Sequence, residues 1–311
     1  MPVPNYHMPV PNYRVPNYMK LQHIALAVFG MAIWGFNFVA ISVGLKELPP
    51  FLFTSIRFVV TVLPFIFFVR KPAITWWQIF TVGMTLLTLQ FAFLFKGMQM
   101  GVGGGVASTV IQCQAFFTLF IGAIILRERP APRDISGLLV AVVGIVLIGL
   151  TMSEASIDGM LVIILASFFW ASGNVLLKRV GDVDMFALIV YASLFPPIPL
   201  FLLSYITEGP EQISAALGAI SMASFVALAY IVLASTLVGY TIWGFLIKNY
   251  EAKQVAPFGL LVPIFGVFSG WLFMGEEFGP QRLLGAALVF AGLVVINWRT
   301  LAPYLKHLSR N

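Results

Sequence analysis

The chain has 311 residues, of which 60% are hydrophobic and 10% are charged, with a net charge of +6 and a mean hydropathy of +0.96. The chain has too few polar residues to cover the surface of a water-soluble protein of this size. The lipid bilayer must therefore be its solvent. A membrane crossing takes about 20 apolar residues, which leaves room for about nine to eleven spans and excludes a sizeable soluble domain.

The first 19 residues differ from the rest of the chain. Val-Pro-Asn-Tyr occurs three times within residues 1–18, and these residues contain no apolar run. We expect residues 1–19 to be a Pro-rich disordered lead-in, or an artefact of the gene start, and not a signal peptide.

Ten apolar runs follow, separated by charged or Pro- and Gly-rich breaks, and they predict ten transmembrane helices. Between the third and fourth runs, Gly101 and the glycines at 103–105 favour a turn. In the ninth run, Pro257 and Pro263 each remove a backbone donor, so we expect a kink there. The predicted spans are 22–44, 51–69, 76–96, 103–126, 134–151, 158–178, 185–206, 221–247, 254–274 and 281–298.

The Lys and Arg residues stand singly or in small groups between apolar runs, which is typical of topology signals and not of a nucleic-acid-binding patch. If the N-terminus is cytoplasmic, only Lys46, Lys96 and Arg282 fall on the outer side, and Arg57 falls within a span. This bias predicts that both termini are cytoplasmic. The cytoplasmic set is Arg14, Lys20, Arg70, Lys71, Arg127, Arg129, Arg133, Lys178, Arg179, Lys248, Lys253, Arg299, Lys306 and Arg310.

The sequence also contains an internal duplication. A slightly smaller shift than 148 residues aligns Trp34 and Asn37 with Trp170 and Asn174. A shift of 148 residues superposes helices four and five on helices nine and ten. The coinciding pairs are Phe117 and Phe265, Phe120 and Phe268, Gly122 and Gly270, Glu128 and Glu276, Pro132 and Pro280, Gly137 and Gly285, and Gly144 and Gly292.

This duplication predicts two five-helix halves, at residues 20–151 and 152–299, followed by a cytoplasmic tail at 300–311. Because five is an odd number, the second half starts on the opposite side of the membrane, and the repeat is inverted. Transporters use inverted repeats to build a central site that is exposed alternately to each side.

Polar side chains in the middle of a span are the first candidates for function, because they are costly in a bilayer unless they have a partner. Asn37 and Asn174 occupy matching places in helices one and six, close to Trp34 and Trp170. Their amides are able to hold a zwitterionic ligand between the two indoles, or to join neighbouring helices. The residues alone leave both interpretations open.

Arg57 is the one cation well inside a predicted span. An uncompensated guanidinium there is unfavourable, so it needs carbonyls, an anion, a water-filled cavity or the membrane interface. It is suited to capture of a substrate carboxylate, because its fork matches the two carboxylate oxygens. The alternatives are that it snorkels to the interface or latches helix ends together.

Helices three and four carry Gln90, Gln112 and Gln114, whose neutral amides suit a polar solute without net charge. Residues two apart face different ways on an α-helix, so we expect Gln112 and Gln114 to face apart. We favour Gln114 as the residue that reaches the cavity, together with Gln90.

Helix eight carries Thr236, Tyr240 and Trp243, which are spaced by four and three and therefore share a face. We include Tyr240 and Trp243 in the candidate substrate site. Core packing is the alternative, since aromatic stripes commonly pack between helices.

No Asp or Glu lies well inside a predicted span. The chain therefore lacks the mid-membrane carboxylate on which a carrier of cationic drugs would hold its substrate. The single cysteine, Cys113, has no partner for a disulfide or a metal site, and we assign it to packing. The sequence has no Walker motif, HExxH motif or Gly-rich βαβ unit, so we predict no enzyme activity, no cofactor and no metal.

Five segments carry a resemblance: 33–38 (IWGFNF), 114–118 (QAFFT), 169–174 (FWASGN), 238–244 (VGYTIWG) and 255–263 (VAPFGLLVP). They resemble EamA-type members of the drug/metabolite transporter superfamily, especially bacterial members that export O-acetylserine and cysteine. The resemblance covers essentially all of the chain after residue 19. The sequence Arg127-Glu128-Arg129 departs from the Gly-Glu-Arg turn of many relatives.

The resemblance implies ten helices in an inverted repeat, a bacterial inner-membrane location and efflux of amino-acid metabolites. It places the central cavity among Trp34, Asn37, Gln90, Gln114, Trp170, Asn174, Tyr240 and Trp243.

The leading hypothesis is a secondary exporter of small amino-acid metabolites that works by alternating access, as a monomer or homodimer. Aromatic amino acids or drug-like amines are an alternative cargo, which the Trp and Phe content allows. A lipid flippase or an intramembrane enzyme would need a basic groove or paired catalytic groups, and neither is evident in the sequence. The expected partners are a small-molecule substrate and the lipid bilayer, not nucleic acid.

Overall fold

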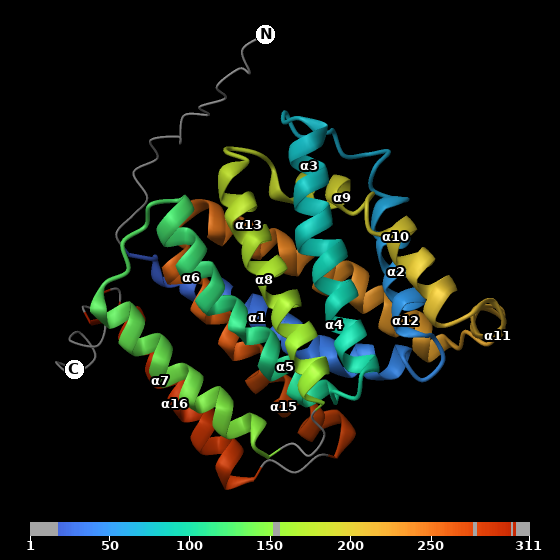
Figure 1. Ribbon diagram of the computed structural model, residues 1–311. Helices are drawn as coiled ribbons and strands as arrows, with labels where there is room; N and C mark the ends of the chain where they lie inside the picture. The colour runs from blue at the N-terminus through green and yellow to red at the C-terminus, as the bar shows by residue number, and fades with distance from the viewer. Residues whose placement is uncertain (1–17, 152–155, 276–278, 300, 303–311) are drawn as a thin grey trace.

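The structure is a computed structural model that describes residues 18–151, 156–275, 279–299 and 301–302. Within these residues every regular element is helical (Figure 1). Residues 1–17 of the predicted lead-in, and most of the predicted C-terminal tail, lie outside the described residues. Glu276, the predicted counterpart of Glu128, lies outside them as well.

The segments follow one another with short connections. In chain order they are α1 (Leu21–Gly44), α2 (Pro50–Val62), α3 (Trp76–Val82), η1 (Gly83–Leu89), α4 (Gln90–Gln99), α5 (Gly104–Val110), η2 (Ile111–Cys113), α6 (Gln114–Ile125), α7 (Pro132–Gly149), α8 (Ile157–Arg179), α9 (Met185–Ala192), α10 (Pro197–Thr207), α11 (Pro210–Gly218), α12 (Met222–Tyr230), η3 (Ile231–Gly239), α13 (Tyr240–Asn249), α14 (Ala252–Val255), η4 (Ala256–Leu260), α15 (Leu261–Met274) and α16 (Pro280–Ile296).

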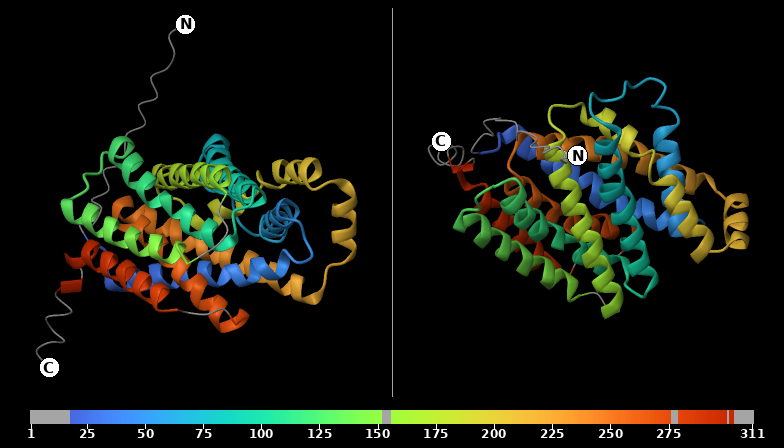
Figure 2. Two further views of the ribbon diagram at one scale, coloured as in Figure 1. Left: turned by 60° about the horizontal axis from the view of Figure 1, so that its bottom comes forward. Right: turned by 45° about the horizontal axis from the view of Figure 1, so that its top comes forward.

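Among the described residues, eight helical runs are long and apolar enough to cross a membrane. Two shorter apolar helices, α2 and α16, coincide with the predicted second and tenth spans. The all-helical membrane fold is therefore confirmed, whereas a count of ten crossings stays a prediction. In both views of Figure 2, α7 and α16 lie at one edge of the bundle and α11 at the opposite edge.

Local sequence sets where the helices begin. Ser156, Asp184 and Ser221 accept hydrogen bonds from first-turn backbone N–H groups and so cap α8, α9 and α12. Proline takes the first position of α2, α7, α11 and α16, where its missing N–H needs no partner. Gly101 has a φ of 93° between α4 and α5, which confirms the predicted glycine turn.

Two predicted spans are less regular than expected. The helix predicted at 51–69 ends at Val62, because Pro64 has no N–H with which to continue it. The helix predicted at 185–206 breaks after Ala192 and resumes at Pro197. Pro196 and Pro197 have no backbone N–H and so interrupt the helical hydrogen bonds.

The two halves approach most closely where α7 packs against α16 (Figure 1). Gly137 lies against Gly292 and Gly144 lies against Gly285, so the two helices run antiparallel. A Cβ added at any of these four glycines would lie 2.4–2.7 Å from a carbonyl oxygen of the other helix. We call these four residues the glycine seam. Because α7 and α16 are corresponding helices, their antiparallel contact is what an inverted repeat requires.

Each half also contains a π-helical segment at the same place. Segment η1 begins at Gly83 and η3 begins at Ile231, which are related by the same shift of 148 residues. In each segment a threonine hydroxyl donates to the carbonyl five residues earlier, from Thr88 to Gly83 at 3.0 Å and from Thr236 to Ile231 at 2.8 Å. The duplication therefore includes a backbone irregularity that the sequence did not predict.

Short 3₁₀ segments interrupt the fourth and ninth spans. Segment η4 contains Pro257, so the ninth span is irregular at this proline, whereas a kink there stays a prediction. A Cβ added at Gly259 in η4 would lie 2.4 Å from Gln114 Nε2 and 3.3 Å from Gln112 Oε1. The expectation that Gln112 and Gln114 face apart is therefore wrong, because the tighter 3₁₀ turn at η2 changes the angle between them.

We expect Gly144→Ala and Gly285→Ala to lower the midpoint of thermal unfolding in detergent. Each substitution forces α7 and α16 apart, and overpacking of this kind costs about 1–3 kcal/mol. Gly218→Ala is the control, because a Cβ there meets nothing within 4 Å. A wild-type midpoint in both seam variants would contradict the close contact.

Candidate functional site

Three aromatic side chains of the second half meet around Trp34 of the first half. Its ring centroid lies 5.5 Å from that of Trp170, 5.1 Å from that of Tyr240 and 5.5 Å from that of Trp243. Trp34 Nε1 donates to the Ser235 carbonyl at 3.0 Å. The helix packing thus brings the four predicted aromatic residues together, and we call them the aromatic cluster.

Asn174 of α8 is fully buried, and its side-chain amide joins α8 to α6 and α13. Its Nδ2 donates to Thr118 Oγ1 at 3.0 Å and to Gln114 Oε1 at 3.4 Å, and its Oδ1 accepts from Trp243 Nε1 at 2.7 Å. Gln114 Nε2 in turn lies 3.5 Å from the Ala256 carbonyl. Protein groups therefore satisfy the donors and the acceptor of Asn174, and the network fixes the indole of Trp243.

Asn37 differs from Asn174, although the two occupy matching places in the sequence. Asn37 is 8% exposed, and its buried Oδ1 accepts no hydrogen bond from a described residue. A buried acceptor without a partner costs about 1–3 kcal/mol, so it requires an explanation. The predicted equivalence of the two asparagines does not extend to their hydrogen bonds.

Arg57 is 4% exposed and lies between α2, α4 and η3. Its Nε donates to Thr236 Oγ1 at 2.7 Å, and its guanidinium carbon lies 4.7 Å from the ring centroid of Phe91 and 5.3 Å from that of Phe58. The two terminal nitrogens form no hydrogen bond or ion pair with a described residue. Burial excludes the snorkelling alternative and leaves a desolvated cation without a carboxylate partner among the described residues.

Gln90 is also buried, and its Oε1 has no hydrogen-bond partner among the described residues. Phe93, less than one turn further along α4, stacks on Phe169 with centroids 5.4 Å apart. Gln90 is therefore close in height to Trp170, whose Nε1 likewise has no described partner. An acceptor on α4 and a donor on α8 thus both lack a described partner at about the same height.

The predicted site includes Gln114 but neither Thr118 nor Gln112, over which we favour Gln114. Thr118 lies four residues after Gln114, and this spacing on one helix face was a usable signal. Gln112 donates from Nε2 to the Ser108 carbonyl at 3.1 Å and lies beside Gly259. No sequence signal indicated the 3₁₀ turn that places it there.

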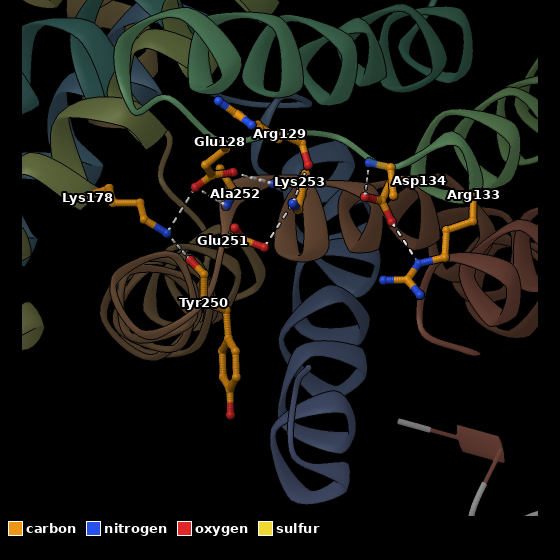
Figure 3. A network of polar contacts seen from close by, with 10 residues as sticks. Glu128, Arg129, Arg133, Asp134, Lys178, Tyr250, Glu251, Ala252 and Lys253 are labelled. Atoms are coloured by element: carbon orange, nitrogen blue, oxygen red, sulfur yellow. Dashed lines mark hydrogen bonds and ion pairs between the residues drawn. The ribbon is translucent and has the colours of Figure 1, made fainter. Parts of the chain in front are cut away.

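At one end of the bundle, polar contacts join connections from both halves (Figure 3). The Glu128 carboxylate accepts hydrogen bonds from the backbone N–H groups of Ala252 at 2.9 Å and Lys253 at 3.2 Å. It also pairs with Lys178 Nζ at 3.2 Å, and Lys178 donates to the Tyr250 carbonyl. Both side chains of this ion pair are largely buried. We call Glu128, Lys178, Tyr250 and Lys253 the latch.

The start of α1 joins the same end, because His23 Nδ1 and Tyr250 Oη are 2.6 Å apart. All four ion pairs among the described residues lie at this end. At the opposite end, carboxylates accept from backbone N–H groups instead. Glu208 accepts from Phe51 at 2.8 Å, and Glu47 accepts from Ser221 at 2.9 Å. Ion pairs between described residues therefore gather at the latch end.

Comparison with known proteins adds relatives of named function. The chain is 36% identical over 277 residues to a probable amino-acid metabolite efflux pump of Salmonella typhimurium, covering 87% of this chain and 93% of the relative. It is 35% identical over 285 residues to a protein of the same description from Escherichia coli, covering 88% and 95%. A solved crystal structure with 16% identity shares the fold, with a TM-score of 0.71 over 91% of this chain and 98% of the other.

The EamA-like transporter family matches the chain twice, over residues 21–150 and 157–298. The two matches agree with the duplicated glycine seam and π segments of the structure. Together with the helical membrane fold, they identify a multi-pass membrane transporter of the efflux type. The chain therefore belongs to the EamA-like transporter family.

Proposed function

We propose that this transporter exports small amino-acid metabolites, of the cysteine or O-acetylserine kind, across the bacterial inner membrane. The observation that supports this proposal most is the buried Arg57, which has no carboxylate partner among the described residues. A substrate carboxylate would supply the missing anion in a bidentate pair. The two bacterial relatives, both probable amino-acid metabolite efflux pumps, agree with this cargo.

The surrounding residues have distinct roles in the proposed site. In this proposal the aromatic cluster contacts the substrate through Trp170, its partly exposed member. Asn37 and Gln90 offer amide oxygens that lack a described partner. Asn174 and Gln114 position Trp243 and do not need to touch the substrate, because protein groups already satisfy them.

We assign the latch end to the cytoplasm, because the predicted cytoplasmic residues Arg129, Lys178 and Lys253 gather there. Both termini are then cytoplasmic, and the latch is the contact that we propose to close the cytoplasmic entrance. Loading the site from the cytoplasm requires the Glu128–Lys178 pair to separate. Alternating access would follow from opening this end while the opposite end closes.

Aromatic amino acids are the second candidate cargo, because the aromatic cluster provides stacking surfaces. Drug-like amines without a carboxylate fit less well. A buried Arg57 repels a cation, and no acidic side chain among the described residues lies near it to compensate.

We expect Arg57→Met to reach the membrane at near wild-type levels and to lose export. Replacing a buried charge by an apolar side chain of similar length is often neutral for folding. Losing the carboxylate contact would raise the KM about ten- to a hundredfold, which corresponds to about 1.4–2.8 kcal/mol. The measurement is uptake of labelled cysteine or O-acetylserine into inside-out vesicles.

The matched control is Arg282→Met. Arg282 Nε also donates to a threonine hydroxyl, that of Thr151, at 3.0 Å, but at the end of the bundle opposite the latch. Its loss should leave the KM within about twofold of wild type. Normal uptake by Arg57→Met would rule out the carboxylate contact.

We expect Lys178→Ala to open the cytoplasmic entrance more often. A cysteine introduced at Gly122 can report on this opening, because a Cβ there would lie next to the latch, 3.7 Å from both Ala252 Cβ and Glu128 Oε2. In a background of Cys113→Ala and Gly122→Cys, a hydrophilic maleimide applied to inside-out vesicles should react at least tenfold faster once Lys178 is replaced. Breaking a buried ion pair costs about 3–5 kcal/mol, more than the 1.4 kcal/mol that a tenfold change requires.

Glu47→Gln, at the opposite end, is the control for this measurement. It should not raise the labelling rate from the cytoplasmic side, because Glu47 bonds to Ser221 and not to the latch. Equal labelling of wild type and Lys178→Ala backgrounds would show that the latch does not gate this entrance.

A further inference from the structure

We infer that the site recognises an intact α-amino acid, with the α-carboxylate on Arg57 and the α-ammonium on the amide oxygen of Asn37. This inference rests on the proposed export of amino-acid metabolites and adds which groups the substrate must keep free. It predicts that an N-acylated amino acid is a poor substrate even when its carboxylate is intact.

The helix register brings Asn37 and Arg57 to the same height. Along α1 and the eighth span, a Cβ at Gly30 would touch Ile242, and a Cβ at Gly239 would touch the Trp34 indole. Helix α1 therefore runs antiparallel to the eighth span, which consists of α12, η3 and α13. Asn37, three residues beyond Trp34, comes level with Thr236.

Thr236 is the residue to which Arg57 donates its Nε–H at 2.7 Å. Asn37 on α1 and Arg57 on α2 thus lie at the level of the same π-helical segment, η3. A π turn is frequent at functional sites because it displaces the backbone from regular α-helical spacing. Here it presents the Thr236 hydroxyl that orients the guanidinium.

The unsatisfied groups are chemically complementary to an α-amino acid. Arg57 has terminal N–H donors without a described partner, which suit a carboxylate. Asn37 Oδ1 is an acceptor without a described partner, which suits an ammonium. An α-amino acid carries both groups on one carbon, so a single ligand satisfies both sides of the site.

The other amides of the region are less suited to the ammonium. Asn174 Oδ1 already accepts from Trp243 Nε1, and Gln114 Oε1 accepts from Thr118 and Asn174. Gln90 Oε1 has no described partner but lies at the height of Trp170, so we assign it to the substrate side chain.

O-acetylserine and N-acetylserine test this assignment, because they are isomers that differ in whether the amino group is free. Each is used to compete with uptake of labelled cysteine into inside-out vesicles. In wild type we expect N-acetylserine to inhibit at least tenfold more weakly than O-acetylserine. In Asn37→Ala, inhibition by O-acetylserine should weaken about tenfold while inhibition by N-acetylserine changes little, so the ratio falls toward one.

Asn174→Ala should change inhibition by both isomers alike and leave their ratio as in wild type, because it acts through Trp243. Equal inhibition by both isomers in wild type would overturn the inference without any variant, as would an unchanged ratio in Asn37→Ala. Failure of wild type to take up cysteine or O-acetylserine at all would instead overturn the proposed function.

Discussion

The hydrocarbon core of a bilayer offers no hydrogen-bond partner, and this constraint governs the polar residues of the protein. Most buried polar side chains are satisfied within the bundle, as Asn174 is by Thr118, Gln114 and Trp243. A few near the centre are not, among them Asn37 Oδ1 and Gln90 Oε1. Because a buried polar group without a partner is costly, these two oxygens are the groups to which we assign the substrate in the proposed site.

The two halves share a backbone but not a set of side chains. Both contain a π segment with a threonine bonded five residues back, and both contribute two glycines to the seam. The polar network around Asn174, however, draws Gln114 and Thr118 from the first half only. At the shift of 148 residues their counterparts are Val262 and Gly266, which have no hydrogen-bonding side chain. A nearly symmetric scaffold therefore surrounds an asymmetric polar network.

Hydropathy predicted the helices well, because a membrane span must be apolar over its whole length. It could not show that the seventh span breaks between Ala192 and Pro197, although the two prolines were visible in the sequence. The π segments have no compositional signature, so the pairing of Arg57 with Thr236 could not be predicted. The aromatic cluster could be anticipated from the matching positions of Trp34 and Trp170. The difference between Asn37 and Asn174 could not, because it depends on neighbours from other helices.

The glycine seam has a consequence for how the halves would move. When two inverted repeats exchange conformations, each contact is replaced by its symmetry mate. The contact of Gly137 with Gly292 becomes that of Gly285 with Gly144, which is already present. The seam is thus unchanged by the exchange, and it lies at one edge of the bundle (Figure 2). Under the proposed alternating access the seam would serve as a fixed pivot, so displacements would grow with distance from α7 and α16 and would be largest on the far side, around α10 to α12.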